Sequence, residues 1–305
     1  MKTTIAVAAL LAAAAARESR IPAGGAALYA RAIGSGPAIV VIHGGPDFDS
    51  SYFLPDLDGL ADGYRLLYYD QRGRGKSADG VKPADVSLES EMSDLDAVRG
   101  FYHAEAPTLL GHSWGAVLAL EYALRHPDHI SRLIIMSPAP ASTADATDFR
   151  AARQKTYADG LARMKAIADT DAYKRGDPDA VAARYRIHFA PAFARGKDLD
   201  AMIARMKVDF ANTDVVKARQ VEDRLYEDTW LKPGGYDLLP KLAAIRVPTL
   251  VIYGNHDMIP EASAVHIAKA IPGARLVRFD NCGHFTFLEC PAATRDAIDA
   301  FFRAR

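Results

Sequence analysis

The stretch LLGHSWGAVLAL, residues 109–120, places Ser113 between two glycines where an apolar run meets a helical pattern. Its centre, GHSWG, fits the pattern Gly-x-Ser-x-Gly, in which a serine occupies a sharp turn between a strand and a helix. Side chains two residues before and after the serine would collide at such a turn, so both positions require glycine. The turn lifts the hydroxyl to the helix N-terminus, whose dipole favours negative charge. By itself, the stretch indicates a tight turn with an exposed hydroxyl.

Strand-like and helix-like segments alternate along the chain after Ile21. Runs such as AIVVIH, RLIIMS and TLVIYG are unbroken and apolar, which is typical of strands buried on both faces of a mostly parallel sheet. Predicted strands cover 27–32, 38–43, 64–70, 107–111, 133–137, 249–254 and 276–280, and predicted helices cover 88–102, 114–126, 262–270 and 292–303. The alternation predicts an α/β fold whose mostly parallel central sheet is flanked by helices.

One long block interrupts this alternation, from about Ala139 to Ile245. It contains helical segments rich in Ala, Arg, Lys and Asp and no convincing buried strand, and VPTLVIYG then resumes the sheet. We therefore predict a core formed by residues 21–138 and 246–305, with residues 139–245 inserted as a helical cap domain over one edge of the sheet.

The two predicted strands TLVIYG and RLVRFD are each followed by a residue that would activate the serine. A serine hydroxyl needs a histidine base held by a carboxylate, in the chain order serine, acid, histidine for this type of turn. Asp257 and His284 fit that order, and loops after parallel strands meet at one edge of the sheet. We predict a catalytic triad of Ser113, Asp257 and His284. His256 is a competing base, but its position beside the acid should point it elsewhere.

An acyl-transfer site also needs hydrogen-bond donors for the oxyanion. The residue after the nucleophile, Trp114, is expected to supply its backbone N–H. A second donor should come from the loop HGGP, residues 43–46. Gly45 is the first choice for this donor and Gly44 the second, and Gly44 is also expected to contact the substrate.

Composition excludes several classes of function. The chain has 305 residues, half of them hydrophobic, a quarter charged, and a net charge of −1 without a concentrated basic run, so a nucleic-acid partner is not expected. The turn DQRGRGKS, residues 70–77, has Asp70 where a phosphate-binding loop requires glycine. HPDH, residues 126–129, is better explained as a solvated helix end than as a metal site. We expect no metal or cofactor, no membrane span, and a small-molecule or short-peptide substrate; the oligomeric state is left open.

Residues 1–20 have the layout of a secretory signal: Lys2, a short apolar run, and small residues before a charged segment. We expect export to the periplasm or the medium, with an Ala-rich N-terminal helix and a cytoplasmic location as the alternative. Export would permit a disulfide between Cys282 and Cys290. Their spacing across a turn and a helix start favours two unpaired, buried thiols instead.

The motifs HGGP, YYDQRGRGKS, GHSWGAVLALEYALRHP, PTLVIYGNHDMIP and CGHFTFLECP together resemble the α/β-hydrolase fold, and more narrowly its proline iminopeptidase branch of serine aminopeptidases. The resemblance spans about residues 38–138 and 247–302. It implies that Ser113, Asp257 and His284 are the family's triad. The family usually has glycine after HGGP, whereas this chain has Asp47, which changes the substrate pocket.

An aminopeptidase must bind a free amine, which requires carboxylates. The cap segment ARQVEDRLYEDTW offers Glu222, Asp223, Glu227 and Asp228, and Glu222 is similar in position to a cap glutamate of the family. A solvated helix face is the competing interpretation. The leading hypothesis is a serine hydrolase that releases N-terminal proline or a similar small residue. The alternatives are an esterase or lactonase for a small acyl substrate, and a non-catalytic binding protein on the same fold.

Overall fold

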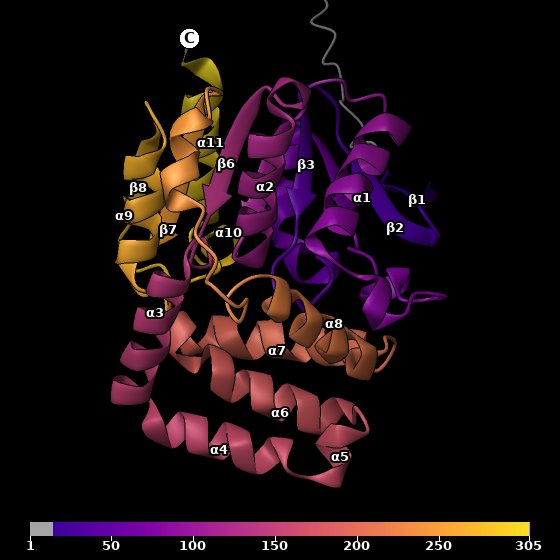
Figure 1. Ribbon diagram of the computed structural model, residues 1–305, viewed down its shortest axis with the longest axis vertical. Helices are drawn as coiled ribbons and strands as arrows, with labels where there is room; N and C mark the ends of the chain where they lie inside the picture. Colours follow the sequence, from indigo (N-terminus) through magenta and orange to yellow (C-terminus); the bar gives the residue numbers. More distant parts are fainter. Residues whose placement is uncertain (1–14, 305) are drawn as a thin grey trace, which may run out of the picture.

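The computed structural model describes residues 15–304, and an eight-stranded sheet runs through them (Figure 1). The strands lie in the order β1-β2-β4-β3-β5-β6-β7-β8. β1 and β2 pair antiparallel, as do β2 and β4, and every other neighbouring pair is parallel. The predicted mostly parallel sheet is confirmed. The strand bounds are β1 Arg17–Ala23, β2 Ala26–Ile33, β3 Ala38–Ile42, β4 Arg65–Tyr69, β5 Thr108–His112, β6 Arg132–Met136, β7 Thr249–Gly254 and β8 Arg275–Phe279.

The apolar strands are buried on both faces, as their unbroken hydrophobic runs predicted. Successive side chains of a strand point to opposite faces, so Leu109 and Leu110 of β5 pack into two different hydrophobic clusters. α1 (Leu88–Phe101), α2 (Trp114–Arg125) and α9 (Glu261–Ala270) cover one face, and α10 (Thr286–Glu289) and α11 (Pro291–Arg303) cover the other. Short 3₁₀ turns connect these elements: η1 Ser50–Phe53, η2 Asp56–Asp62, η3 Gly75–Ser77, η4 Pro83–Asp85, η5 Pro127–His129, η6 Ala190–Ala192 and η7 Leu239–Ala244.

The helical block between β6 and β7 lies across one end of the sheet (Figure 1). Between residues 139 and 245, all of which the structure describes, the regular elements are helical and a single isolated bridge joins Ser142 to Asp237. The helices are α3 Thr143–Thr156, α4 Ala158–Ala168, α5 Asp171–Lys174, α6 Pro178–Phe189, α7 Gly196–Phe210 and α8 Val215–Asp228. Their buried side chains, such as Tyr185 and Met202, join the cluster on the α11 face, so the block packs against the core.

The first strand differs from the sequence expectation. Arg17–Arg20, assigned above to a secretory segment, belong to β1 and pair with β2 from Arg17↔Ala32 onward. Ile21 of this strand is buried against the sheet, which stabilises the pairing. Residues 1–14, which carry most of the predicted signal, lie outside the described residues.

The cysteines also differ from expectation, because Cys282 and Cys290 form a disulfide. Their Cα atoms lie 6.2 Å apart, within the range that a disulfide can bridge. The short helix α10 turns the chain back on itself between them, and the sequence pattern alone did not reveal this reversal. Among the described residues, no helix combines the length and the apolar character needed to cross a bilayer.

Candidate active site

Ser113 occupies the turn between β5 and α2 with φ 55° and ψ −118°, a conformation that non-glycine residues rarely adopt. A Cβ on Gly111 would lie 2.3 Å from the Gly115 carbonyl oxygen, and one on Gly115 would lie 2.2 Å from that of Ile42. Hydrogen bonds on both sides hold the strained turn: Ser113 N donates to Met136 O at 3.1 Å, and Ala139 N donates to Ser113 O at 3.1 Å. The backbone thus presents the Ser113 side chain at the start of α2.

The loops after β7 and β8 bring Asp257 and His284 together. His284 Nδ1 lies 2.9 Å from each carboxylate oxygen of Asp257, and Asp257 Oδ1 also accepts a hydrogen bond from Ile259 N at 2.8 Å. The side chains of His284 and Asp257 are 2% and 6% exposed, so their pairing is screened from water. His256 is exposed and does not line the cavity described next.

Ser113 and His284 line a cavity of about 460 Å³, a volume in the usual range for small-ligand sites. Its floor is the end of the sheet, and its walls include residues of α3, α6 and α8. Glu222 and Asp223 of α8 line it too, so the helix directs part of its charged face toward Ser113. The cap helices and the nucleophile turn therefore enclose one space.

The HGGP loop lies against the nucleophile turn. A Cβ on Gly44 would come 2.9 Å from the Ser113 Cβ, and Gly45 has φ +122°, where a Cβ would lie 2.4 Å from Asp47 N. The Gly44 N–H donates to Tyr52 Oη at 2.7 Å, which leaves Gly45 as the loop's predicted oxyanion donor. Trp114, the other predicted donor, is fully buried.

Tyr52 and His112 form a hydrogen-bonded connection that the sequence reasoning missed. Tyr52 Oη lies 2.7 Å from His112 Nδ1, and His112 Nε2 lies 3.0 Å from the carbonyl oxygen of His284. Every bond is satisfied if Tyr52 donates to Nδ1 and a neutral His112 donates from Nε2. Burial and then the charge of His284 lower the pKa of His112 well below its usual value, consistent with the neutral ring. This chain joins the HGGP loop, the nucleophile turn and the histidine loop; the only signal in the sequence was the place of His112 inside the motif.

Asp47 is the second feature whose role the sequence did not reveal. It lines the cavity with Glu222, and Tyr185 Oη donates a hydrogen bond to its Oδ2. Burial raises the pKa of Asp47 to about 6, with Arg184 opposing the shift. Burial and then the charge of Asp47 raise the pKa of Glu222 to about 8. Asp47 and the α8 residue Glu222 thus line the same cavity, and the charge of Asp47 acts on Glu222.

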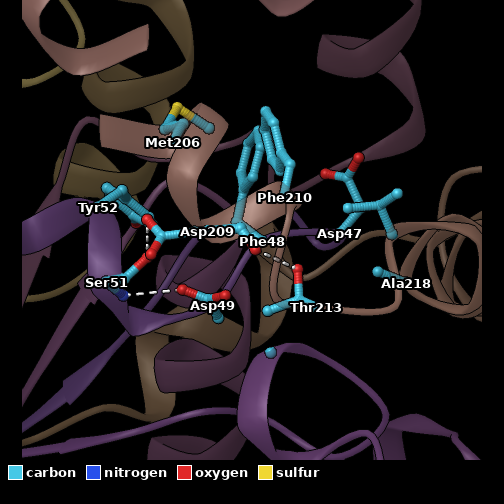
Figure 2. A pocket seen from close by; sticks show the side chains of 12 residues that line it. Asp47, Phe48, Asp49, Ser51, Tyr52, Met206, Asp209, Phe210, Thr213 and Ala218 are labelled. Carbon is cyan, nitrogen blue, oxygen red and sulfur yellow. Dashed lines mark hydrogen bonds between the residues drawn. The ribbon is translucent and has the colours of Figure 1, made fainter. Parts of the chain in front are cut away.

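Another cavity, which shares Asp47, Phe48 and Tyr52 with the first, has a volume of about 20 Å³, room for about one water molecule. Figure 2 shows its lining by Asp49, Ser51 and Asp209, with Ser51 hydrogen-bonded to both aspartates. It is too small to admit a substrate, so the larger cavity is the candidate active site.

One group of potential metal ligands occurs among the described residues, formed by Asp96, His126 and His129. Arg99 Nη2 lies 3.1 Å from Asp96 Oδ1 and 3.3 Å from His129 Nδ1. A guanidinium that donates to two of the three ligands opposes cation binding there. Asp96 lies on α1, and His126 and His129 follow the end of α2; none of the three lines the cavity.

The fold and this arrangement of side chains define the class of protein. The family profile described as the α/β hydrolase fold matches residues 37–291, and the chain belongs to that family. This confirms the family resemblance deduced from the sequence motifs.

Individual proteins that are similar to this chain include proline iminopeptidases and an esterase. A proline iminopeptidase of Saccharolobus solfataricus is 28% identical over 265 residues, covering 85% of this chain and 82% of that protein. The structure of proline iminopeptidase from Mycobacterium smegmatis superposes with a TM-score of 0.68 at 23% identity, covering 93% of this chain and 97% of the other. The esterase EaEST from Exiguobacterium antarcticum gives a TM-score of 0.73 at 23% identity, with coverages of 94% and 100%. At these identities the two structures establish the shared fold.

Proposed function

We propose that the protein is a serine hydrolase that acts by acyl transfer. Ser113 attacks the substrate carbonyl while His284 takes its proton, and Asp257 orients the imidazole and stabilises its charged form. His284 then returns the proton to the leaving group, and water resolves the acyl-enzyme by the same route. The support is the buried Asp257–His284 pair and the position of His284 and Ser113 on one cavity.

The oxyanion of the tetrahedral intermediate is stabilised by two backbone N–H groups, those of Gly45 and Trp114. Gly45 fits this role because its neighbour Gly44 already donates to Tyr52. Trp114 fits because it is the first residue of α2, where the N–H groups of a helix lack intrahelical partners.

We further propose an aminopeptidase that releases N-terminal proline or a similar small residue. The observation that carries this proposal is the pair of carboxylates, Asp47 and Glu222, on the cavity that also holds Ser113. Because their pKa values are raised, the two carboxyl groups tend to hold a proton when no substrate is bound. A substrate ammonium that enters between them takes the place of that proton and gains charge-assisted hydrogen bonds. The peptidase relatives at 28% identity support the same assignment.

An esterase or lactonase for a small acyl substrate is the second candidate. It is favoured by the apolar part of the cavity wall, where Phe48, Phe149 and Phe189 offer a surface suited to an uncharged acyl group. Both candidates use the same triad, so they differ only in whether a free amine is required.

Two experiments test the proposal. A fluorophosphonate probe should label the folded wild-type protein and fail to label Ser113→Ala; an unlabelled wild type would support a binding protein instead.

Turnover should then be compared for proline arylamide, its N-acetylated analogue and a short acyl ester. Acetylation should reduce kcat/KM by at least tenfold, whereas equal rates with and without the acetyl group would favour the esterase.

A further inference from the structure

The active-site cavity contains cations as well as carboxylates. Three arginines from α3 and α6 line it together with three acidic residues: Arg150, Arg153 and Arg184, and Asp47, Glu222 and Asp223. Within residues 15–304, no ion pair of 4.0 Å or less joins any of these arginines to a carboxylate, whereas Arg186 of the same helix α6 pairs with Asp200. Opposite charges therefore share the cavity without neutralising each other by contact.

Two of the carboxylates, Asp47 and Glu222, are held by tyrosines rather than by arginines. Tyr185 donates to Asp47, and Tyr226 Oη donates to Glu222 Oε1 at 2.7 Å. The arginines rest on aromatic rings: the Arg184 guanidinium lies 5.4 Å from the centroid of Tyr173, and that of Arg153 lies 5.7 Å from that of Phe149. Both sets of charges are thus positioned independently, which leaves each available to a ligand.

Several donors beside the cavity are unsatisfied. Among the described residues, the donors Arg153 Nε and Arg184 Nε are shielded from solvent and have no hydrogen-bond partner, and neither has the ring nitrogen His188 Nδ1. Arg153 Nη2 makes one long contact, 3.5 Å, to the carbonyl oxygen of His188. Buried donors without partners are rare in folded proteins, because each costs free energy that a bound acceptor would recover.

The charges around the cavity also shift the pKa values of its titratable groups. Burial, then Arg153, Arg184 and His284, lower the pKa of His188 well below its usual value. Arg184 also opposes the raised pKa values of Asp47 and Glu222. His188 is therefore a neutral ring, and it lines the same cavity as Arg153 and Arg184.

We propose that Arg153, Arg184 and His188 form a binding site for a carboxylate of the substrate, and that the cavity takes a short peptide carrying both a free amine and a free carboxylate, a dipeptide foremost. The assignment rests on the proposed aminopeptidase function, since the amine end occupies the acidic pair. In a dipeptide the carboxylate belongs to the leaving amino acid, so the arginines orient the group that His284 must protonate.

The test compares the dipeptide Pro-Ala with its C-terminal amide, Pro-Ala-NH₂. Wild type should show a kcat/KM at least tenfold higher for Pro-Ala, the size expected for charge-assisted hydrogen bonds to one carboxylate. In Arg153→Gln this ratio should fall toward one, and Arg153→Lys should restore part of it. Arg163→Gln, which changes an exposed arginine of α4 outside the cavity, should keep the wild-type ratio.

A binding measurement separates this inference from the proposed function. Calorimetry with Ser113→Ala should show Pro-Ala binding at least tenfold more tightly than Pro-Ala-NH₂, and the double variant Ser113→Ala/Arg153→Gln should lose that preference. Equal binding of the two ligands, or binding of neither, would overturn the carboxylate site. If proline arylamide is hydrolysed while wild type treats Pro-Ala and its amide alike, the aminopeptidase stands and the carboxylate site fails. If no amine substrate is turned over, the aminopeptidase fails, and calorimetry still decides the carboxylate site.

Discussion

The Tyr52 hydroxyl accepts a hydrogen bond from Gly44 N and lies 2.7 Å from His112 Nδ1, so one side chain joins the HGGP loop to the nucleophile turn. His112 continues the connection to the His284 carbonyl oxygen at 3.0 Å. Residues from three loops, separated by up to 240 positions in the sequence, are thereby fixed relative to one another.

Replacing Tyr52 with phenylalanine removes the hydroxyl and leaves both the Gly44 N–H and His112 Nδ1 without a partner in a buried site. The free energy of unfolding should fall by about 1–3 kcal/mol, and kcat should fall about tenfold because the oxyanion loop loses its anchor. Tyr64→Phe removes a hydroxyl that donates to Asp299 at 2.6 Å, remote from the cavity. This control should lose stability but not kcat; an equal loss of kcat in both variants would contradict the prediction.

Asp257→Asn should reduce kcat by roughly 10³- to 10⁴-fold while the protein stays folded. The amide cannot stabilise a positively charged His284, and it favours the tautomer with the proton on the wrong nitrogen. The matched control is Asp280→Asn, an exposed aspartate after β8 that pairs with Arg278 and should retain full activity. Steady-state rates together with circular dichroism spectra check the prediction, and near-normal activity of the Asp257 variant would remove this residue from the triad.

Gly111→Ala should destabilise the protein by roughly 3 kcal/mol or more, because the new Cβ would lie 2.3 Å from a backbone oxygen that cannot move without disturbing the nucleophile turn. Gly100→Ala provides the contrast. Its Cβ would meet nothing within 4 Å on helix α1, so the substitution should stabilise by about 0.5–1 kcal/mol. Urea unfolding of the two variants should shift the midpoint in opposite directions.

Breaking the Cys282–Cys290 disulfide should lower the free energy of unfolding by about 2–3 kcal/mol, the value expected for so short a closed loop. The bridge encloses His284, and Glu289 within it accepts hydrogen bonds from Gly283 N and from Ala194 N of the cap. Cys290→Ser should therefore also reduce kcat by loosening His284. Dithiothreitol should lower the melting temperature of wild type and leave that of Cys290→Ser unchanged. An equal decrease in both proteins would show that dithiothreitol destabilises them by some means other than reducing this disulfide.

The acidic pair gives the pH dependence of amine binding a definite sign. Both carboxyl groups have raised pKa values, about 6 for Asp47 and about 8 for Glu222, so both are neutral well below pH 6 and become charged as the pH rises. Only the charged forms attract a substrate ammonium, whose own pKa is about 8. KM for proline arylamide should therefore fall between pH 6 and pH 8.

Glu222→Gln should flatten the upper part of that KM profile. Glu227→Gln, on the same helix but exposed, should leave it as in wild type. A short acyl ester, which has no amine, serves as the substrate control. If KM for the ester followed the same pH profile, the titration would belong to the catalytic machinery rather than to the amine site.

Much of the fold could be predicted because the buried strands are nearly continuous apolar runs. β3, β5, β6 and β7 were each placed within about a residue, since hydrophobic burial on both faces leaves a local signature. β1 was missed because it lies at the sheet edge and alternates exposed and buried residues directly after an alanine-rich run. Exposed alternation is a weaker signal than an unbroken apolar run.

The sequence alone indicated the candidate groups that can be recognised from local patterns: Ser113 between its glycines, and Asp257 and His284 on loops after strands. Their chemistry depends on residue type and on the edge of a parallel sheet, and both can be inferred from the chain. Tertiary structure alone decided which side chains meet: the Tyr52–His112–His284 connection, the disulfide around His284, and the cavity shared by Asp47, Glu222 and the cap arginines. The cavity depends on how the helices of residues 139–245 pack over the sheet, and all of these contacts join side chains whose sequence spacing carries no periodic signal.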